Sequence, residues 1–255
     1  MLLLVDVGNT NTVIGLYEKD DLICDWRIHT ESSVTEDEFN ILISNLFSSK
    51  KIHSSDIRKT VISCVVPPMI RILNAYCNKY LGHAPFWVDA DSVNIPVLYD
   101  NPSEVGADRL VNAIAAYHLY KTSLIVIDFG TATTFDVITG QGEYIGGAIA
   151  PGIGIAAESL FLHASKLPRV ELFNPPKTVI GKNTAHSMKS GIIYGYAELV
   201  DGMVRRIKKE MQSPNPKVIA TGGLAPLMQN ISQTIEAVEM GLTLEGLRII
   251  SKSMG

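Results

Sequence analysis

Residues 2–10 read LLLVDVGNT, and residues 124–133 read LIVIDFGTAT. Each stretch is an apolar run that ends in Asp-x-Gly followed by small hydroxyl or amide residues. An apolar run that stops at a turn signal is typical of a strand buried on both faces. The glycine lets the backbone approach a ligand, and the Asn and Thr side chains add donors that suit anionic oxygens. The repeated signature predicts two phosphate-handling turns, which start at Asp6 and Asp128.

The chain after each turn continues as a second strand, over residues 12–17 (TVIGLY) and 135–138 (FDVI). Each turn is therefore predicted to be a hairpin. A Walker loop or a Rossmann fingerprint instead runs from a strand into a helix, whose N-terminus receives the phosphate. The stretch 152–157 matches such a fingerprint only weakly because no full βαβ unit surrounds it, and Lys182 is followed by Asn183 where a Walker loop needs Ser or Thr. Both alternatives are disfavoured.

The composition is that of a soluble globular enzyme. The chain has 255 residues, of which 46% are hydrophobic and 19% charged, and no apolar run approaches the roughly 18 to 20 residues of a membrane span. The two signatures lie about half the chain apart, which predicts related halves over residues 1–117 and 118–255. A net charge of −4 argues against a protein built to bind nucleic acid.

The N-terminus and the cysteines predict a cytoplasmic protein. Met1 leads directly into the first predicted strand, which leaves no room for a cleavable signal. Cys24, Cys64 and Cys77 are odd in number and lack the close spacing of a zinc or dithiol site, so we expect reduced thiols.

Local patterns predict the remaining elements. A third strand is expected over 22–29, a helix after the capping box at 35–38, and a strand over 61–66 that Pro67 ends by starting a helix. Residues 89–107 are rich in Asp, Asn, Pro and Ser and predict an irregular, substrate-facing loop. The later helices are expected at 110–120, 155–163, 185–211 and 242–253, with a strand at 218–221 before a glycine turn.

Four motifs together resemble one family. They are DVGNTNT at 6–12, GADRLVN at 106–112, DFGTATT at 128–134 and GGAIAPG at 146–152. Their order resembles the actin-like superfamily of acetate and sugar kinases, and their detail resembles type III pantothenate kinases. The resemblance implies an α/β fold of duplicated actin-like (ribonuclease H-like) domains, with mixed five-stranded sheets flanked by helices and a cleft between the halves.

The resemblance also implies an activity. Such an enzyme uses ATP to phosphorylate pantothenate to 4'-phosphopantothenate, the first step of coenzyme A biosynthesis, and works as a homodimer with Mg²⁺ and a monovalent cation, K⁺ or NH₄⁺. By this resemblance Asp128 holds the monovalent cation. The implied ATP contacts are Asp6, Val7, Gly8, Asn9, Thr10, Asn11, Thr12, Val13 and Thr131. The implied pantothenate contacts are Tyr99, Gly106, Ala107, Arg109 and Thr184. Gly222 and Gly223 match the place where related folds bind adenosine.

The residue chemistry around position 108 agrees with a phosphoryl transfer. A primary hydroxyl that attacks phosphorus needs a group to accept its proton, and Asp108 is our candidate for this catalytic base. Asn112 is expected to share its helix face, at i and i+4. Arg109 can grip a substrate carboxylate through two parallel hydrogen bonds. The plainer alternatives are a helix-capping role for Asp108 and a surface or interdomain salt bridge for Arg109.

Two other function classes remain open on the same fold. One is a regulatory or accessory protein without kinase activity. The presence of all four charged residues, Asp6, Asp108, Arg109 and Asp128, gives no sign of lost chemistry. The other is an actin-like ATPase or chaperone, which usually carries insertions that this short chain has no room for.

Overall fold

The computed structural model describes residues 1–211 and 215–253, and its contacts divide the chain into two compact units. The first unit comprises Met1–Ala115 and the chain from Thr243 onward, and the second comprises Ala116–Leu242. From residue 118 on, the sequence predicts a single C-terminal half. By contact, however, the closing helix groups with the first unit.

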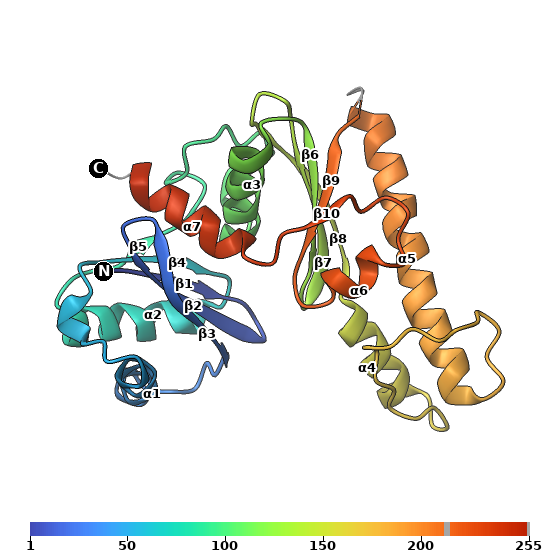
Figure 1. Ribbon diagram of the computed structural model, residues 1–255, viewed down its shortest axis with the longest axis horizontal. Coiled ribbons are helices and arrows are strands. Elements are labelled where there is room, and N and C mark those ends of the chain that lie inside the picture. Colours follow the sequence, from blue (N-terminus) through green and yellow to red (C-terminus); the bar gives the residue numbers. More distant parts are fainter. Residues whose placement is uncertain (212–214, 254–255) are drawn as a thin grey trace. The chain divides into compact units, whose positions relative to one another are not determined.

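The first unit is a five-stranded sheet with helices on both faces (Figure 1). Its strands are β1 (Leu2–Val7), β2 (Asn11–Glu18), β3 (Asp21–His29), β4 (Lys59–Cys64) and β5 (Phe86–Trp87), in the order β3-β2-β1-β4-β5. The helices α1 (Glu36–Ser49) and α2 (Pro67–Tyr76) pack on one face, over Leu3, Val5 and Val7. The first part of α3 (Ala107–Tyr120) and α7 (Leu242–Ser253) pack on the other, over Leu4 and Val61.

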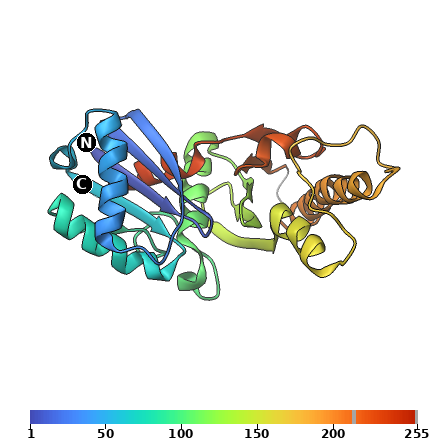
Figure 2. The same cartoon turned by 90° about the horizontal axis from the view of Figure 1, so that it is seen from below.

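The second unit repeats this arrangement. Its strands are β6 (Leu124–Phe129), β7 (Ala132–Ile138), β8 (Tyr144–Pro151), β9 (Lys217–Thr221) and β10 (Ala237–Val238), in the order β10-β9-β6-β7-β8. In both sheets the first three strands form an antiparallel meander and the last two run parallel to the first. The helices α4 (Ile153–His163), α5 (Thr184–Met211) and α6 (Ala225–Gln229) contribute to the core on one face, and Figure 2 shows them from a second side. The predicted duplication of mixed five-stranded sheets is confirmed.

Local sequence signals explain where several helices begin. Thr35 accepts a hydrogen bond from the amide N of Glu38, whose carboxylate accepts one from Thr35 in return, so the predicted capping box is present at α1. Pro67 occupies the start of α2, where its missing N–H costs nothing. Three single-turn helices complete the first unit: η1 (Ser54–Asp56), the π-helical η2 (Cys77–Leu81) and η3 (Pro102–Glu104).

Some elements differ from the sequence prediction. The helix α3 begins at Ala107 rather than at 110, which brings Asp108 into its first turn. The strand β4 lies two residues earlier than predicted, over Lys59–Cys64. The two-residue strands β5 and β10 and the short α6 were not predicted. These short elements carry no periodicity of their own, and the two strands exist because they pair with β4 and β9.

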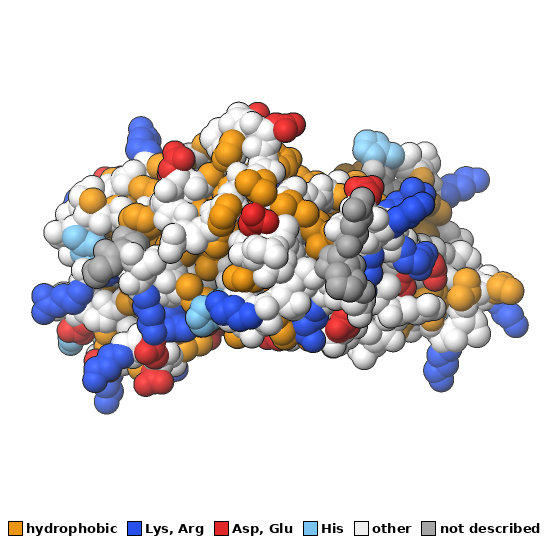
Figure 3. All heavy atoms as spheres, turned by 90° about the horizontal axis from the view of Figure 1, so that it is seen from above, with side chains coloured by type: hydrophobic (Ala, Val, Ile, Leu, Met, Phe, Trp, Pro, Cys, Tyr) orange, Lys and Arg blue, Asp and Glu red, His pale blue; other side chains and the backbone are white. Residues whose placement is uncertain are grey.

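Charges are mixed on the surface. On the face drawn in Figure 3, Lys and Arg side chains stand singly or in small groups, with Asp and Glu among them. Among the helices of the described residues, none combines the length and the apolar character that a membrane crossing requires.

Candidate functional site

The turn between β1 and β2 is the predicted hairpin. The amide N of Gly8 donates to the carbonyl of Asn11 (3.0 Å), which closes the turn and leaves Asn9 and Thr10 exposed. Asp6 is half-buried one residue before the end of β1. Because side chains alternate along a strand, Asp6 lies on the face of Leu4, which α3 and α7 cover.

Asp108 lies in the first turn of α3. A Cβ atom at Gly106 would lie only 2.6 Å from Oδ1 of Asp108, so the glycine leaves the space that this carboxylate fills. The amide N of Arg109 donates to the same oxygen (2.8 Å), which fixes the carboxylate and satisfies one open amide of the helix start. Burial raises the pKa of Asp108, and the hydrogen bond and charge of Arg109 only partly offset this effect. A carboxylate with a raised proton affinity is suited to accept a proton.

The two aspartates of the first unit belong to one end of its sheet. Val65, which follows β4, donates its amide N to the carbonyl of Val7 at the end of β1 (3.1 Å). Its side chain lies 3.6 Å from where a Cβ at Gly106 would be, directly before α3. Val65 therefore connects the end of the strand that carries Asp6 with the start of the helix that carries Asp108.

The neighbours of Asp108 differ in exposure. Arg109 is only 8% exposed, so the alternative of a surface salt bridge does not describe it. Tyr99, which would be expected in the core if the resemblance were set aside, is 36% exposed. Asn112 is buried and its Oδ1 accepts a hydrogen bond from Thr243 of α7 (2.9 Å). This hydrogen bond ties α3 to α7.

The second unit contains the other hairpin. The amide N of Gly130 donates to the carbonyl of Ala132 (3.1 Å), and Thr131 at the tip is exposed. Asp128 is half-buried, and Gly222 packs against it. A Cβ at Gly222 would lie 2.5 Å from Oδ1 of Asp128 and 2.6 Å from the carbonyl oxygen of Phe129, and its φ of +90° also favours glycine. The Thr-Gly-Gly turn after β9 thus lies directly beside the second aspartate.

A cavity of about 470 Å³ opens next to this turn. It is lined by α4, by the segment 169–173 and by Gly223 and Leu224. Thr184, the first residue of α5, is exposed. No described residue belongs to a group of three or more His, Cys, Asp or Glu side chains that could hold a metal ion.

One contributor was missed at the sequence level. Gly152 donates its amide N to the carbonyl of Thr131 (3.1 Å), and a Cβ at this position would lie 2.2 Å from the same oxygen. Gly152 therefore supports the second hairpin by close packing. Gly152 ends the motif at 146–152, and the sequence indicates only that a helix begins there, which is confirmed because Gly152 is the N-cap of α4.

Comparison with known proteins identifies relatives along the whole chain. A family model of type III pantothenate kinases matches residues 2–206. A type III pantothenate kinase of Desulfatibacillum aliphaticivorans is 66% identical over 251 residues, which cover 98% of this chain and 97% of that protein. One from Desulforapulum autotrophicum is 61% identical over 253 residues, which cover 98% and 96%.

Solved structures of more distant proteins share the fold. A Sinorhizobium meliloti protein described as a 2-dehydro-3-deoxygalactonokinase superposes with a TM-score of 0.62 at 11% identity, covering 100% of this chain and 99% of that one. A Campylobacter jejuni protein described as a Baf family transcriptional activator gives 0.61 at 18% identity, covering 99% and 98%. At such identities the similarity establishes only the fold, which is that of the actin-like kinases.

Proposed function

The chain belongs to the type III pantothenate kinase family, the ATP-dependent kinases that phosphorylate pantothenate in coenzyme A biosynthesis, and we propose that Asp108 is its catalytic base. In this proposal the carboxylate accepts the proton of the attacking pantothenate hydroxyl. The observation that carries it is the start of α3, where the absent side chain of Gly106 makes room for a half-buried carboxylate whose pKa is raised. The amide of Arg109 occupies Oδ1, so Oδ2 is the atom we assign to the proton.

The hairpin of the first unit is proposed to bind the phosphates of ATP. The residues involved are Asp6, Val7, Gly8, Asn9, Thr10, Asn11, Thr12 and Val13. The exposed side chains at its tip and its main-chain amides supply the donors that phosphate oxygens need. Mg²⁺ bound with ATP would neutralise charge that develops on the transferred phosphoryl group. Asp6, one residue before the end of β1, would hold this ion or its water shell.

We assign the second hairpin to the nucleotide and to a monovalent cation. Thr131 would add a donor to the ATP phosphates. Asp128 and the carbonyl of Phe129, both within contact of Gly222, offer the oxygen ligands that K⁺ or NH₄⁺ requires. Gly222 and Gly223 are proposed to lie under the adenosine, which is supported by the cavity that opens beside them.

Pantothenate is proposed to bind beside Asp108. Arg109 would bind its carboxylate, because a guanidinium can donate two parallel hydrogen bonds to one carboxylate. Tyr99, Gly106, Ala107 and Thr184 complete the proposed set. The exposure of Tyr99 and Thr184 supports a role at a ligand surface, and the burial of Arg109 means that it would act as a fixed donor.

A coupled assay with several acceptors tests the function. Purified protein is given ATP and Mg²⁺ with pantothenate, or with a panel of sugars and short hydroxy acids, and ADP release is measured. We expect turnover with pantothenate only. Turnover with a sugar but not with pantothenate would contradict the proposed acceptor, and no ATP-dependent turnover with any acceptor would favour the accessory-protein alternative, which the family assignment does not support.

The cation proposal has its own test. Replacing K⁺ by Na⁺ is expected to lower the rate, and NH₄⁺ to restore it, because NH₄⁺ is close to K⁺ in size whereas Na⁺ is smaller. The Asp128→Asn variant should lose this ion dependence. Equal rates in K⁺ and Na⁺ for the unmodified protein would remove the cation from Asp128.

We further propose that the protein is a homodimer in the cytoplasm. The helix α4 and the segment 164–183, which hydrogen bonds tie to α4 and α5, carry large exposed apolar side chains such as Leu162 (64%) and Phe173 (74%). Surfaces of this kind mark protein interfaces. Light scattering is expected to give twice the chain mass, and Leu162→Glu with Phe173→Glu to give monomers, whereas Ile41→Glu on α1 should not. A wild-type monomer at micromolar concentration would contradict the dimer.

A further inference from the structure

Thr30, the residue that follows β3, forms hydrogen bonds with two carbonyl groups in the hairpin of the first unit. Its amide N donates to the carbonyl of Thr10 (3.0 Å), and its hydroxyl donates to the carbonyl of Gly8 (2.7 Å). The hydroxyl of Thr12 lies 2.9 Å from that of Thr30. Thr30 is only 9% exposed and Thr12 only 1%, so these bonds are shielded from water.

The direction of the hydrogen bonds follows from their chemistry. A carbonyl oxygen can only accept, so the single hydroxyl proton of Thr30 is committed to Gly8. The hydroxyl of Thr12 must then donate to the oxygen of Thr30. Each hydroxyl in such a chain polarises the next, which strengthens the bonds cooperatively. Thr12, Thr30 and Gly8 therefore form one directed chain that ends on the backbone of the hairpin.

Fixing the carbonyl of Gly8 also fixes the amide of Asn9. The peptide bonds of the hairpin are trans, so the C=O and N–H of each peptide group point in opposite directions. Because the hydroxyl of Thr30 holds the carbonyl of Gly8, the N–H of Asn9 points away from Thr30. Amide dipoles held in a fixed direction are the kind of donor that stabilises an anion without reorganising first.

At the matching place, the second hairpin is supported by a different residue, Gly152. Gly152 follows β8 as Thr30 follows β3, and its amide N donates to the carbonyl of Thr131. It has no side chain to reach the carbonyl of Gly130. Instead a Cβ there would lie 2.7 Å from that oxygen, so the Cα of Gly152 packs close to it. The hydroxyl of Thr30 is thus a feature of the first hairpin only.

We propose that Thr30 is a positioning residue for phosphate binding, whose hydroxyl holds the peptide group between Gly8 and Asn9 and so aims the amide of Asn9 at the nucleotide, without touching the nucleotide itself. The inference rests on the proposed function in that ATP is taken as the ligand of this hairpin. It does not depend on which acceptor is phosphorylated.

The test compares ATP binding and catalysis in matched variants. Thr30→Val keeps the β-branched shape and removes the hydroxyl, while Thr30→Ser keeps the hydroxyl. We expect Thr30→Val to raise the KM for ATP by about tenfold to a hundredfold, with the KM for pantothenate unchanged, because a small misplacement of donors has effects of this size. Thr30→Ser should stay close to wild type. In amide NMR spectra, ATP should shift the signal of Asn9 in wild type and shift it much less in Thr30→Val.

Thr60→Val is the control. Thr60 is equally buried and shares a hydrogen bond with the ring of His83 (2.9 Å), but it pairs with Leu3 at the other end of β1. It should lose stability without any change in the KM for ATP. The proposal is overturned if Thr30→Val has a wild-type KM for ATP, if Thr60→Val raises the KM equally, or if ATP leaves the amide signal of Asn9 unmoved in wild type. ATP-induced shifts that depend on Thr30, without turnover of pantothenate, would uphold this proposal and refute the proposed acceptor.

Discussion

At the scale of single residues, an absent side chain governs the position of the proposed base. Gly106 has an ordinary negative-φ backbone, so its role is not conformational freedom but the space that the carboxylate of Asp108 occupies. The sequence could point to Gly106 only through its family motif. It could not reveal the reason, because the 2.6 Å approach depends on the carboxylate folding back toward the amide of Arg109.

We therefore expect Gly106→Ala to lower kcat without unfolding the protein. The new methyl group displaces the Asp108 carboxylate, while Val65 at 3.6 Å leaves room for it. A loss of about tenfold to a hundredfold is expected from a shift of this size. Gly195→Ala in α5 is the control, because nothing lies within 4 Å of its added Cβ. Wild-type kcat for Gly106→Ala would show that the carboxylate position is not critical.

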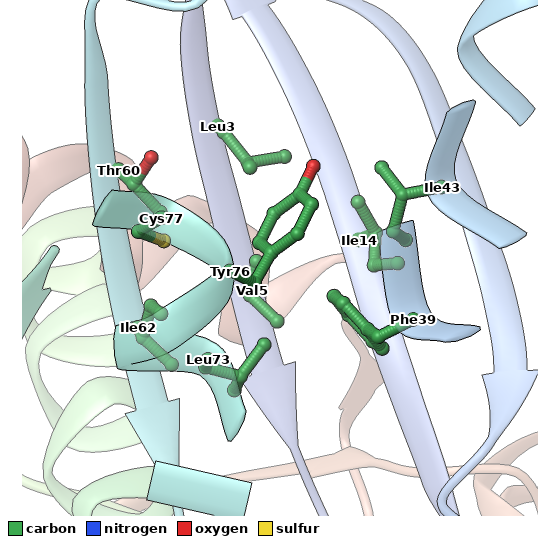
Figure 4. A pocket seen from close by; sticks show the side chains of 10 residues that line it. All are labelled: Leu3, Val5, Ile14, Phe39, Ile43, Thr60, Ile62, Leu73, Tyr76 and Cys77. Carbon is green, nitrogen blue, oxygen red and sulfur yellow. The ribbon is translucent and has the colours of Figure 1, made fainter. Parts of the chain in front are cut away.

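Tyr76 has a buried hydroxyl that costs stability and has no evident function. Tyr76 is buried in the core of the first unit, and its ring packs edge-on against Phe39 at 5.1 Å. Figure 4 shows its hydroxyl among apolar side chains, and within the described residues it has no hydrogen-bond partner. Burial in these surroundings raises its pKa. The small cavity beside it measures about 10 Å³.

Tyr76→Phe is expected to stabilise the fold by about 1 kcal/mol, because it removes a buried unsatisfied hydroxyl and keeps the ring contacts. Urea unfolding measures the change. A loss of stability greater than about 1 kcal/mol would mean that the hydroxyl has a partner after all, such as a single water in the adjacent cavity.

At the scale of elements, local signals succeed where the structure is local. The capping box at Thr35, the start of α2 at Pro67 and the bounds of α7 follow from the sequence alone. The strands β5 and β10 do not, because two residues carry no period and their existence depends on pairing with strands elsewhere in the chain. The early start of α3 was hidden by Gly106 and by the polar residues 89–104, which together suggest a longer loop.

The buried carboxylate of Asp201 stabilises the turn between α6 and β10, which no local sequence pattern indicates. Asp201 of α5 is 1% exposed and accepts hydrogen bonds from the amides of Gln233 (2.9 Å) and Thr234 (3.2 Å) and from the hydroxyls of Ser232 and Thr234. Burial alone would raise its pKa, but these hydrogen bonds outweigh it and leave the pKa below its usual range. Asp201 thereby fixes the turn between α6 and β10.

Asp201→Asn should destabilise the protein by about 2–3 kcal/mol at neutral pH, because the hydrogen bonds to a charged acceptor are lost. A depressed pKa contributes stability that is present above the unfolded value of about 3.9 and disappears as the pH falls through the folded value. Wild type should therefore lose this contribution on acidification, and the variant should lose less. Asp21→Asn, at an exposed position on β3, is the control. Parallel acid-unfolding curves for wild type and Asp201→Asn would contradict this role.

At the scale of the whole molecule, the duplication is the feature that the sequence predicts most directly. Two Asp-x-Gly signatures half a chain apart are enough to infer two related sheets, and both sheets have the same strand order. The grouping of α7 with the first unit is not predictable in this way. It depends on contacts between distant positions, such as Thr243 with Asn112 and Lys59 with the carbonyl of Ser251 (2.8 Å).

In the proposed site, too, the sequence indicates some parts and not others. The hairpins are evident from their residues, since the glycines and hydroxyl side chains that make them suitable for phosphate are consecutive in sequence. The supports of these hairpins are not evident. Thr30, Gly152 and Gly222 reach them only through the sheet, from the ends of β3, β8 and β9.

The most direct test of the central claim is the Asp108→Asn variant, measured for turnover and for stability together. We predict that kcat falls by at least about a hundredfold, as expected for the loss of a general base, while ATP still binds. Because burial raises the pKa of Asp108, its ionised form costs stability as the pH rises above about 3.9, so the thermal midpoint at neutral pH should stay the same or increase. Turnover at the wild-type rate in a folded Asp108→Asn protein would contradict the account.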